Sequence, residues 1–313
     1  MKVCYGAGKI NHKFRRPVLS IGVFDGVHLG HKYIIKKIVE RARRIRGTSI
    51  VFTFYPHPYH VLKPHKYLPL LISLEHRIRL LADLGVDVCI VQGFTERFSK
   101  IDKIRFIENI LLKEINPSEI FVGKDFNFGK NKLGNIKLLT ERERIHNFKV
   151  RVIPTRLIGT RKISSTLIRS LIQKGNLKKA ARFLGRRVSI FGKIVKGSRR
   201  GKILGFPTAN IDYKHEVLPS KGVYAVKIKL DKKRFLGVAN IGLRPSFKKS
   251  ARGRVVVEVY IFNFNKRIYG KSIEVEFVKK IRNENKFKNR SSLVRQIEED
   301  LKKTRQIFKS PTR

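Results

Sequence analysis

Two histidines stand three residues apart, directly after a short apolar segment. The stretch reads Gly22-Val-Phe24-Asp25-Gly26-Val-His28-Leu-Gly30-His31. Glycine lets a backbone approach a ligand closely, and the start of a helix offers free N–H groups to a phosphate. Imidazoles at this spacing can donate to phosphate oxygens and stabilise the charge of a leaving pyrophosphate. We therefore predict catalytic roles for the two histidines and a phosphate-binding loop that comprises Gly22, Phe24, Asp25, Gly26 and Gly30.

A second segment with phosphate-binding chemistry is Ser164-Ser165-Thr166-Leu-Ile-Arg169. Hydroxyls and N–H groups at a helix start, followed by the fork of an arginine, are what a triphosphate requires. We predict that Ser164, Ser165 and Thr166 bind the nucleotide and that Arg169 is catalytic.

The second half of the chain has no GxxxxGK[ST] motif, so phosphoryl transfer there requires another cradle. A loop rich in Gly and Arg runs through Gly201 and Gly205 into Pro207-Thr208-Ala-Asn210. In an extended segment, Thr208 and Asn210 lie on one side. A hydroxyl and an amide oxygen suit Mg²⁺, which prefers oxygen donors. We predict that these two residues bind the metal and that Gly201, Gly205 and Pro207 bind the nucleotide.

Strands and helices alternate in the first half of the chain. This order would place the strand-to-helix loops, including the histidine loop, at one edge of a sheet. Apolar runs predict strands, and segments with helical periodicity separate them. This order predicts a parallel, doubly wound α/β sheet, in which ligands bind at the carboxyl ends of strands. The expected strands are 17–24, 49–54, 86–91, 119–122 and 149–153, and the expected helices are 28–46, 74–84, 101–113 and 135–144.

The pattern changes near Gly185. Short β-branched runs follow one another with glycines at their edges and no helices between them, which indicates a small antiparallel barrel or sandwich. Residues 291–308 then form an amphipathic pattern that predicts a terminal helix. We expect two domains, residues 1–185 and 186–313. The expected strands of the second are 188–195, 223–230, 235–241, 255–262 and 272–278.

The two phosphate motifs resemble those of the nucleotidylyltransferase superfamily, which carries HxGH and a later SSTxIR segment. The whole chain resembles the bacterial bifunctional riboflavin kinase/FAD synthetases. That resemblance implies FMN adenylyltransferase activity in the first domain and riboflavin kinase activity in the second, with ATP, riboflavin, FMN and FAD as substrates and products. The second-domain motifs of the resemblance include Gly222-Val-Tyr-Ala225 and Asn240-Ile-Gly-Leu-Arg244-Pro-Ser246.

The resemblance also assigns roles to residues whose type alone is uninformative. It implies that Glu258, an acid within a strand of valines, is the base that deprotonates riboflavin, and that Arg244 binds substrate. It implies that flavin is held by two loops with aromatic and polar residues, through Pro56, Pro58, Asp125 and Phe128. The family usually has Glu in place of Tyr55 and Asp in place of Asn263, which leaves open an enzyme with one working site.

Composition excludes several classes of protein. The 313 residues carry a net charge of +48, split as +24 in residues 1–185 and +24 in 186–313. Because the excess is spread along the chain, we expect no nucleic-acid partner, although a basic binding protein stays the alternative. No apolar run is long enough to span a membrane, and no secretory signal is visible. We expect a cytoplasmic protein with reduced cysteines that is monomeric or weakly self-associating.

Overall fold

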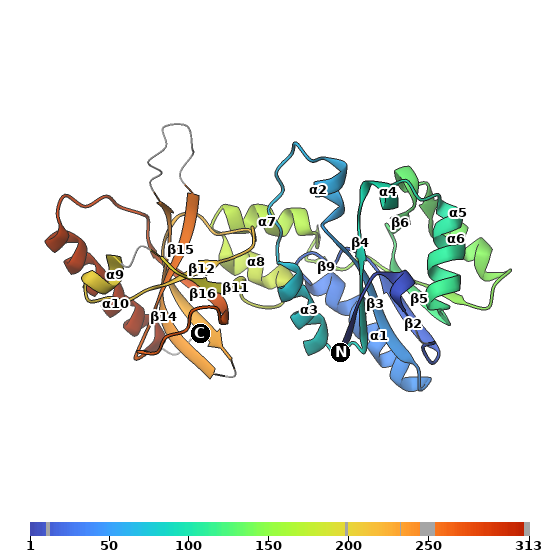
Figure 1. Cartoon of the computed structure of the whole chain (residues 1–313), viewed down its shortest axis with the longest axis horizontal. Helices are drawn as coiled ribbons and strands as arrows, with labels where there is room; N and C mark the ends of the chain where they lie inside the picture. Colours follow the sequence, from blue (N-terminus) through green and yellow to red (C-terminus); the bar gives the residue numbers. More distant parts are fainter. Residues whose placement is uncertain (11–12, 198–199, 232, 245–253, 310–313) are drawn as a thin grey trace. The chain divides into compact units, whose positions relative to one another are not determined.

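The structure is a computed structural model that describes residues 1–10, 13–197, 200–231, 233–244 and 254–309 (Figure 1). It contains two compact units. The first comprises Met1–Pro69 and Leu74–Ser165, and the second combines Leu70–Ser73 with the residues from Thr166 onward. The domain boundary expected between Gly185 and Arg186 stays a prediction.

A six-stranded parallel sheet organises the first unit, in the order β1-β4-β3-β2-β5-β8. The inner strand β2 is buried along its whole length, which explains its unbroken apolar sequence. The strands are β1 (Lys2–Tyr5), β2 (Pro17–Ile21), β3 (Thr48–Tyr55), β4 (Val88–Gly93), β5 (Glu119–Gly123) and β8 (Lys149–Ile153). Strand β1, which lies at the edge beside β4, was absent from our expectations.

Helices flank both sides of this sheet (Figure 1). One face packs against Phe106, Ile107 and Leu111 of a π-helix and Leu139 of α6. The helices are α1 (Leu29–Arg44), α2 (Pro58–Leu62), α3 (Leu74–Asp83), α4 (Glu96–Ser99), α5 (Lys103–Arg105), the π-helix (Phe106–Ile115) and α6 (Ile136–Glu143). The helix expected over 101–113 is thus a short α-helix that continues in π geometry. The doubly wound α/β prediction is confirmed.

Short elements complete the first unit. They are the pair β6 (Asn127–Phe128) and β7 (Gly134–Asn135), the hairpin of β9 (Leu157–Ile158) and β10 (Arg161–Lys162), and the 3₁₀ turns Ala7–Lys9 and Lys130–Lys132. Cys4 and Cys89 lie on neighbouring strands as free thiols, and burial raises the pKa of Cys89 to about 12.

A closed antiparallel barrel forms the second unit, in the order β11-β12-β15-β14-β13-β16. Its strands are β11 (Ser189–Val195), β12 (Ala209–Asp212), β13 (Gly222–Leu230), β14 (Lys233–Arg244), β15 (Arg254–Ile261) and β16 (Ser272–Arg282). Glycine is required where strands approach closely, because a Cβ on Gly192 would lie 2.0 Å from the carbonyl oxygen of Asp212. The predicted barrel is confirmed; β12, which closes it, was not expected as a strand.

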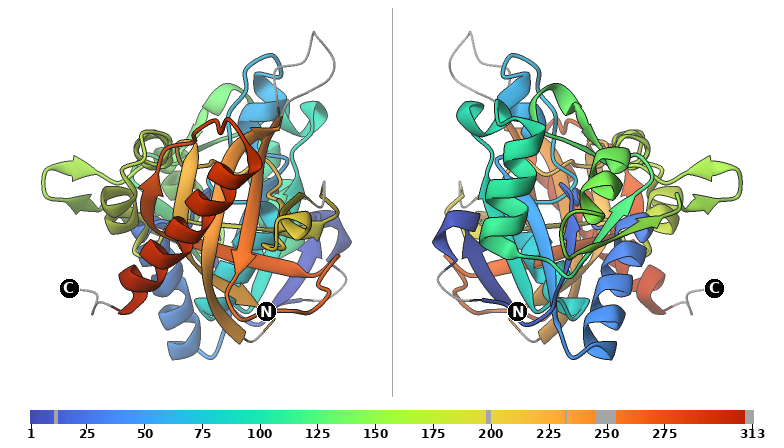
Figure 2. Two further views of the ribbon diagram at one scale, coloured as in Figure 1. Left: turned by 90° about the vertical axis from the view of Figure 1, so that its left-hand side faces the viewer. Right: turned by 90° about the vertical axis from the view of Figure 1, so that its right-hand side faces the viewer.

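The helices described in this part of the chain are α7 (Ser165–Gln173), α8 (Leu177–Leu184), α9 (Arg200–Ile203) and the terminal α10 (Arg290–Lys309). Helix α10 runs across the outside of the barrel (Figure 2). Within the described residues, no helix combines the length and apolarity needed to cross a bilayer.

The tetrapeptide Leu70–Ser73 belongs to the second unit, where it contacts Glu216. Glu216 is buried, with 1% of its surface exposed. The Glu216 carboxylate accepts from the N–H of Ser73 at 2.7 Å and from the N–H of Phe191 at 3.1 Å. The N–H of Val217 donates to the carbonyl oxygen of Leu70. A segment that precedes α3 in sequence is therefore part of the barrel unit.

Candidate active sites

The histidine loop joins β2 to α1, at the carboxyl edge of the parallel sheet. His28 is the N-cap of α1, and its Nδ1 accepts from the N–H of His31 at 3.2 Å. The two imidazoles stack with centroids 3.5 Å apart, and the Phe24 ring meets His31 edge-on at 5.2 Å. A Cβ on Gly30 would lie 3.3 Å from the His28 ring. This glycine therefore makes room for the imidazole of His28.

His31 is a neutral imidazole at physiological pH. Burial lowers its pKa well below 6.5, and the nearby His28 and Arg77 lower it further. In the described part of the chain, its buried Nδ1 has no hydrogen-bond partner. His31 can therefore offer a hydrogen bond but not a positive charge.

A hydrogen bond joins Ser165 of the second phosphate segment to the histidine loop. Ser165, the first residue of α7, donates from Oγ to the carbonyl oxygen of Asp25 at 2.9 Å. Asp25 is 2% exposed. This contact joins Ser165 to Asp25, which is 140 residues away in sequence. Ser164 immediately precedes α7, and Thr166 and the buried Arg169 follow on it.

Seven phenylalanines gather at and beneath the ends of β3, β4 and β5. Neighbouring rings in this cluster have centroids 5.3 to 6.4 Å apart. Its members are Phe52, Phe54, Phe94, Phe98, Phe106, Phe126 and Phe128. The predicted contact residue Phe128 is 7% exposed, so it belongs mainly to the core. Its half-buried members supply apolar rings of the kind that bind a flat ligand; they are Phe54, Phe94, Phe98 and Phe126.

The loop after β3 carries the predicted prolines. Pro56 follows Tyr55, whose residue is 48% exposed, and Pro58 begins α2, which His57 caps by accepting from the N–H of Tyr59. On the next predicted loop, the Asp125 carboxylate is paired with Lys162 of β10. This hydrogen bond and charge lower the pKa of Asp125. Asp125 is therefore ionised, and in this structure its partner is a lysine of the same unit.

In the barrel, three polar residues lie opposite one another on adjacent strands. Glu258 of β15 pairs in register with Asn210 of β12 on one side and with Asn240 of β14 on the other. Cross-strand partners place their side chains on the same face of a sheet. Because Val257 and Val259 are buried, Glu258 lies on the opposite, outer face. Sequence reasoning assigned no role to Asn240; its signal is visible once the strand register is known.

The glycine loop packs against both predicted metal ligands. A Cβ on Gly197 would lie 2.1 Å from the amide nitrogen of Asn210, and one on Gly201 would lie 3.1 Å from Oγ1 of Thr208. The N–H of Phe206 donates to the carbonyl oxygen of Gly201, which closes the turn at α9. Gly205 has φ +88°, and the exposed Pro207 leads into β12. Hydroxyl and amide oxygens that closely approach glycine backbone fit a hard cation shared with phosphate.

The outer wall of this region is formed by α10 and the segment before it. Leu301 and Ile297 of α10 pack with Phe206, Tyr260 and Val223. Glu284, in the segment between β16 and α10, accepts from the N–H of Leu243 at 3.2 Å. The predicted Arg244 ends β14, but its side chain lies outside the described residues, as do residues 245–253.

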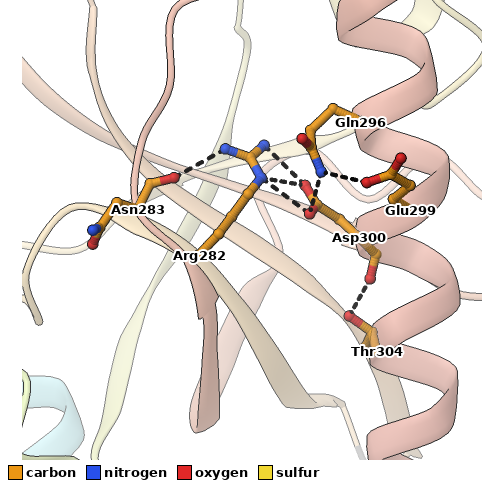
Figure 3. Close-up of polar contacts among 6 residues, drawn as sticks. All are labelled: Arg282, Asn283, Gln296, Glu299, Asp300 and Thr304. Atoms are coloured by element: carbon orange, nitrogen blue, oxygen red, sulfur yellow. Dashed lines mark hydrogen bonds and ion pairs between the residues drawn. The ribbon is translucent and has the colours of Figure 1, made fainter.

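Arg282 attaches α10 to the barrel (Figure 3). Its guanidinium contacts the Asp300 carboxylate at 2.9 to 3.0 Å and donates to the carbonyl oxygen of Asn283. Gln296 also donates to Asp300. The Arg282 guanidinium also lies over the Phe287 ring, 5.5 Å from its centroid. One residue thereby orients both the helix and the segment that carries Glu284.

Comparisons with known proteins agree with this two-part geometry. A family model described as FAD synthetase matches residues 10–167, and one described as riboflavin kinase matches residues 184–308. A solved structure described as a macrolide-efflux protein from Streptococcus pneumoniae has a TM-score of 0.81 and 29% identity, over 97% of this chain and 99% of that one.

Curated relatives match along the full chain. A protein from Buchnera aphidicola subsp. Schizaphis graminum is 36% identical over 98% of this chain and 99% of its own length. One from Haemophilus influenzae is 35% identical over 99% and 100%, and one from Escherichia coli K12 is 36% identical over 93% and 92%. Each is named a bifunctional riboflavin kinase/FMN adenylyltransferase.

Fold and site therefore define an enzyme with a nucleotidyltransferase unit and a phosphotransferase unit. The chain belongs to the family of bifunctional riboflavin kinase/FMN adenylyltransferases.

Proposed function

We propose that the barrel unit converts riboflavin and ATP to FMN and ADP, and that the α/β unit converts FMN and ATP to FAD and diphosphate. The observation that carries the kinase assignment is the cross-strand pairing of Glu258 with Asn210. It supports a base and a cation ligand on one face of the barrel. Glu258 takes the proton from the 5′-hydroxyl of riboflavin as that oxygen attacks the γ-phosphorus of ATP.

Mg²⁺ is proposed as the kinase cofactor, with Thr208 and Asn210 as its protein ligands. When bound, it offsets the charge of the ATP phosphates. The close approach of Gly197 to Asn210 and of Gly201 to Thr208 supports a role for the glycine backbone before Pro207, including Gly205, in holding the phosphates. We also assign Arg244 to the binding of ATP in the barrel unit.

In the α/β unit, a phosphate oxygen of FMN attacks the α-phosphorus of ATP and diphosphate leaves. No covalent intermediate is required, so the protein supplies position and stabilises charge. We assign His28 and His31 to the phosphates as hydrogen-bond donors, and Arg169 to the developing charge. Binding of ATP is assigned to the backbone of the histidine loop and to Ser164, Ser165 and Thr166, and binding of the flavin ring to Pro56, Pro58, Asp125 and Phe128.

The decisive experiment follows flavins by chromatography after the full chain is mixed with riboflavin, ATP and Mg²⁺. Sequential appearance of FMN and FAD is the expected result. Accumulation of FMN without FAD contradicts the adenylyltransferase assignment, and added FMN that stays unchanged confirms that loss. A metal-free reaction with EDTA tests the Mg²⁺ proposal, since the kinase step should stop. We also keep the predictions that the protein is cytoplasmic, monomeric or weakly associating, and has small-molecule partners rather than nucleic acid.

A further inference from the structure

Arg77 is a charged residue that is completely buried beneath the adenylyltransferase site. It lies on α3 and its residue is 0% exposed. Its Nη1 donates to Oγ1 of Thr53 at 2.9 Å and to the carbonyl oxygen of Phe54 at 3.1 Å. Its Nε is buried and has no hydrogen-bond partner among the described residues. An arginine held in this way costs considerable desolvation free energy, so packing alone is a poor explanation for it.

Thr53 extends the contact of Arg77 into the histidine loop. Its hydroxyl accepts from Arg77 and donates to the carbonyl oxygen of Val23 at 3.0 Å. Val23 directly precedes Phe24 and Asp25 in the loop between β2 and α1. Thr53 itself is 0% exposed and lies two residues before the end of β3. The chain of contacts therefore joins the two loops that we assign to different substrates.

The same contacts lie close to the start of both loops. Phe54 leads into Tyr55 and Pro56, on the flavin side, and Val23 leads into the histidine loop, on the nucleotide side. In adenylyl transfer, an oxygen of one substrate must reach a phosphorus of the other. A small displacement between the two binding loops therefore lowers the rate of transfer strongly.

We propose that Arg77 is a positioning residue for FMN adenylylation, which acts through Thr53 to hold the flavin-binding and phosphate-binding loops in register. The inference rests on the proposed function of the α/β unit. Arg77 does not touch substrate. Its positive charge also favours the neutral form of His31, because it lowers the pKa of that imidazole.

The test compares kcat and KM for FMN adenylylation in full-length variants, with the riboflavin kinase activity of the same chain as an internal measure of folding. Arg77→Met should lower kcat by about tenfold to a hundredfold with a smaller change in KM for FMN and ATP. Arg44→Met, an identical substitution at an exposed residue of α1, should leave adenylylation unchanged.

Two substitutions of Thr53 keep the test decisive if the Arg77→Met variant does not fold. Thr53→Val removes the hydroxyl and retains the shape and the arginine, so it should also lower kcat, and Thr53→Ser should restore it. Equal kcat in Thr53→Val, Thr53→Ser and the unmodified enzyme would overturn the proposal. So would a loss confined to KM. If the unmodified chain forms no FAD from FMN, the proposed function itself fails, which is a different result.

Discussion

The Arg282 guanidinium and the Asp300 carboxylate are in contact at 2.9 to 3.0 Å, although their residues belong to the last barrel strand and the terminal helix. The side chains are 17% and 4% exposed. A buried charge that loses its partner is strongly destabilising, whereas an apolar pair of similar size is tolerated. The contact therefore determines where α10 lies on the barrel.

Removal of Arg282 should destabilise the barrel unit. We expect Arg282→Met to lower its free energy of unfolding by roughly 3–5 kcal/mol, because Asp300 stays buried without its cation. Arg282→Met combined with Asp300→Leu should recover most of this loss. Denaturant unfolding, with kinase activity as the probe of the barrel, measures both. Arg295→Met, on an exposed position of α10, is the control. An unchanged midpoint for Arg282→Met would contradict the prediction.

Glu258→Gln should abolish FMN formation and spare FAD formation from added FMN. The amide cannot accept the proton of the riboflavin hydroxyl, and the α/β unit does not contain this residue. Separate assays of the two steps provide the measurement. Glu298→Gln, at an exposed position of α10, should leave both rates unchanged. If Glu258→Gln retained full kinase activity, the base would have to be another group.

Substitutions at His28 separate helix capping from catalysis. Asn is a good N-cap, so His28→Asn should preserve the start of α1 and yet remove the imidazole. We expect FMN adenylylation to fall by about a hundredfold in both His28→Asn and His28→Ala. Only His28→Ala should also lose about 1 kcal/mol of stability. An unchanged rate of FMN adenylylation in His28→Asn would show that His28 acts only as the N-cap of α1.

Gly197→Ala should impair the kinase specifically. The new Cβ would lie 2.1 Å from the Asn210 amide, so this side chain must shift from its position. We expect a higher KM for Mg²⁺-ATP with FMN adenylylation unchanged. Gly93→Ala is a matched control because no atom lies within 4 Å of its Cβ. Unaltered kinetics in Gly197→Ala would argue against Asn210 as a ligand.

Acidification should weaken the α/β unit through His31. Its pKa in the folded chain is lowered below 6.5, so the unfolded chain binds more protons as the pH falls below that value. Stability from this group is therefore complete above about pH 7 and decreases on acidification below about 6.5. The melting temperature of the unmodified protein should fall more between pH 7.5 and 5.5 than that of His31→Asn. Equal slopes would contradict the assignment.

Local sequence patterns predicted most of the helices and strands. The elements that they missed have weak local signals. The apolar runs of β2, β3 and β5 are buried on both faces, so composition alone identifies them. Strand β1 is a four-residue edge strand, and β12 follows Pro207 and contains Asn210 and Asp212, so neither has a clear apolar signal. The π geometry of 106–115 has no signature in helical periodicity.

Some residues of the candidate sites were predicted from sequence and others were missed. The histidine motif and the serine motif are each a continuous stretch of sequence, so sequence alone singles them out, although their roles stay predictions. Arg77 was missed because an arginine within an amphipathic helix normally faces water, and its burial depends on Thr53, which is 24 residues away. Asn240 becomes informative only when β14 and β15 are placed in register with Glu258 opposite it.

The binding of Leu70–Ser73 to Glu216 bears on how this polypeptide could be recombined. A break anywhere between residues 74 and 165 would leave a C-terminal fragment whose Glu216 lacks the N–H of Ser73. The two catalytic halves are therefore not freely exchangeable modules. A chimera that joins one half of this chain to the other half of a relative must also match the donor's tetrapeptide to the acceptor's carboxylate.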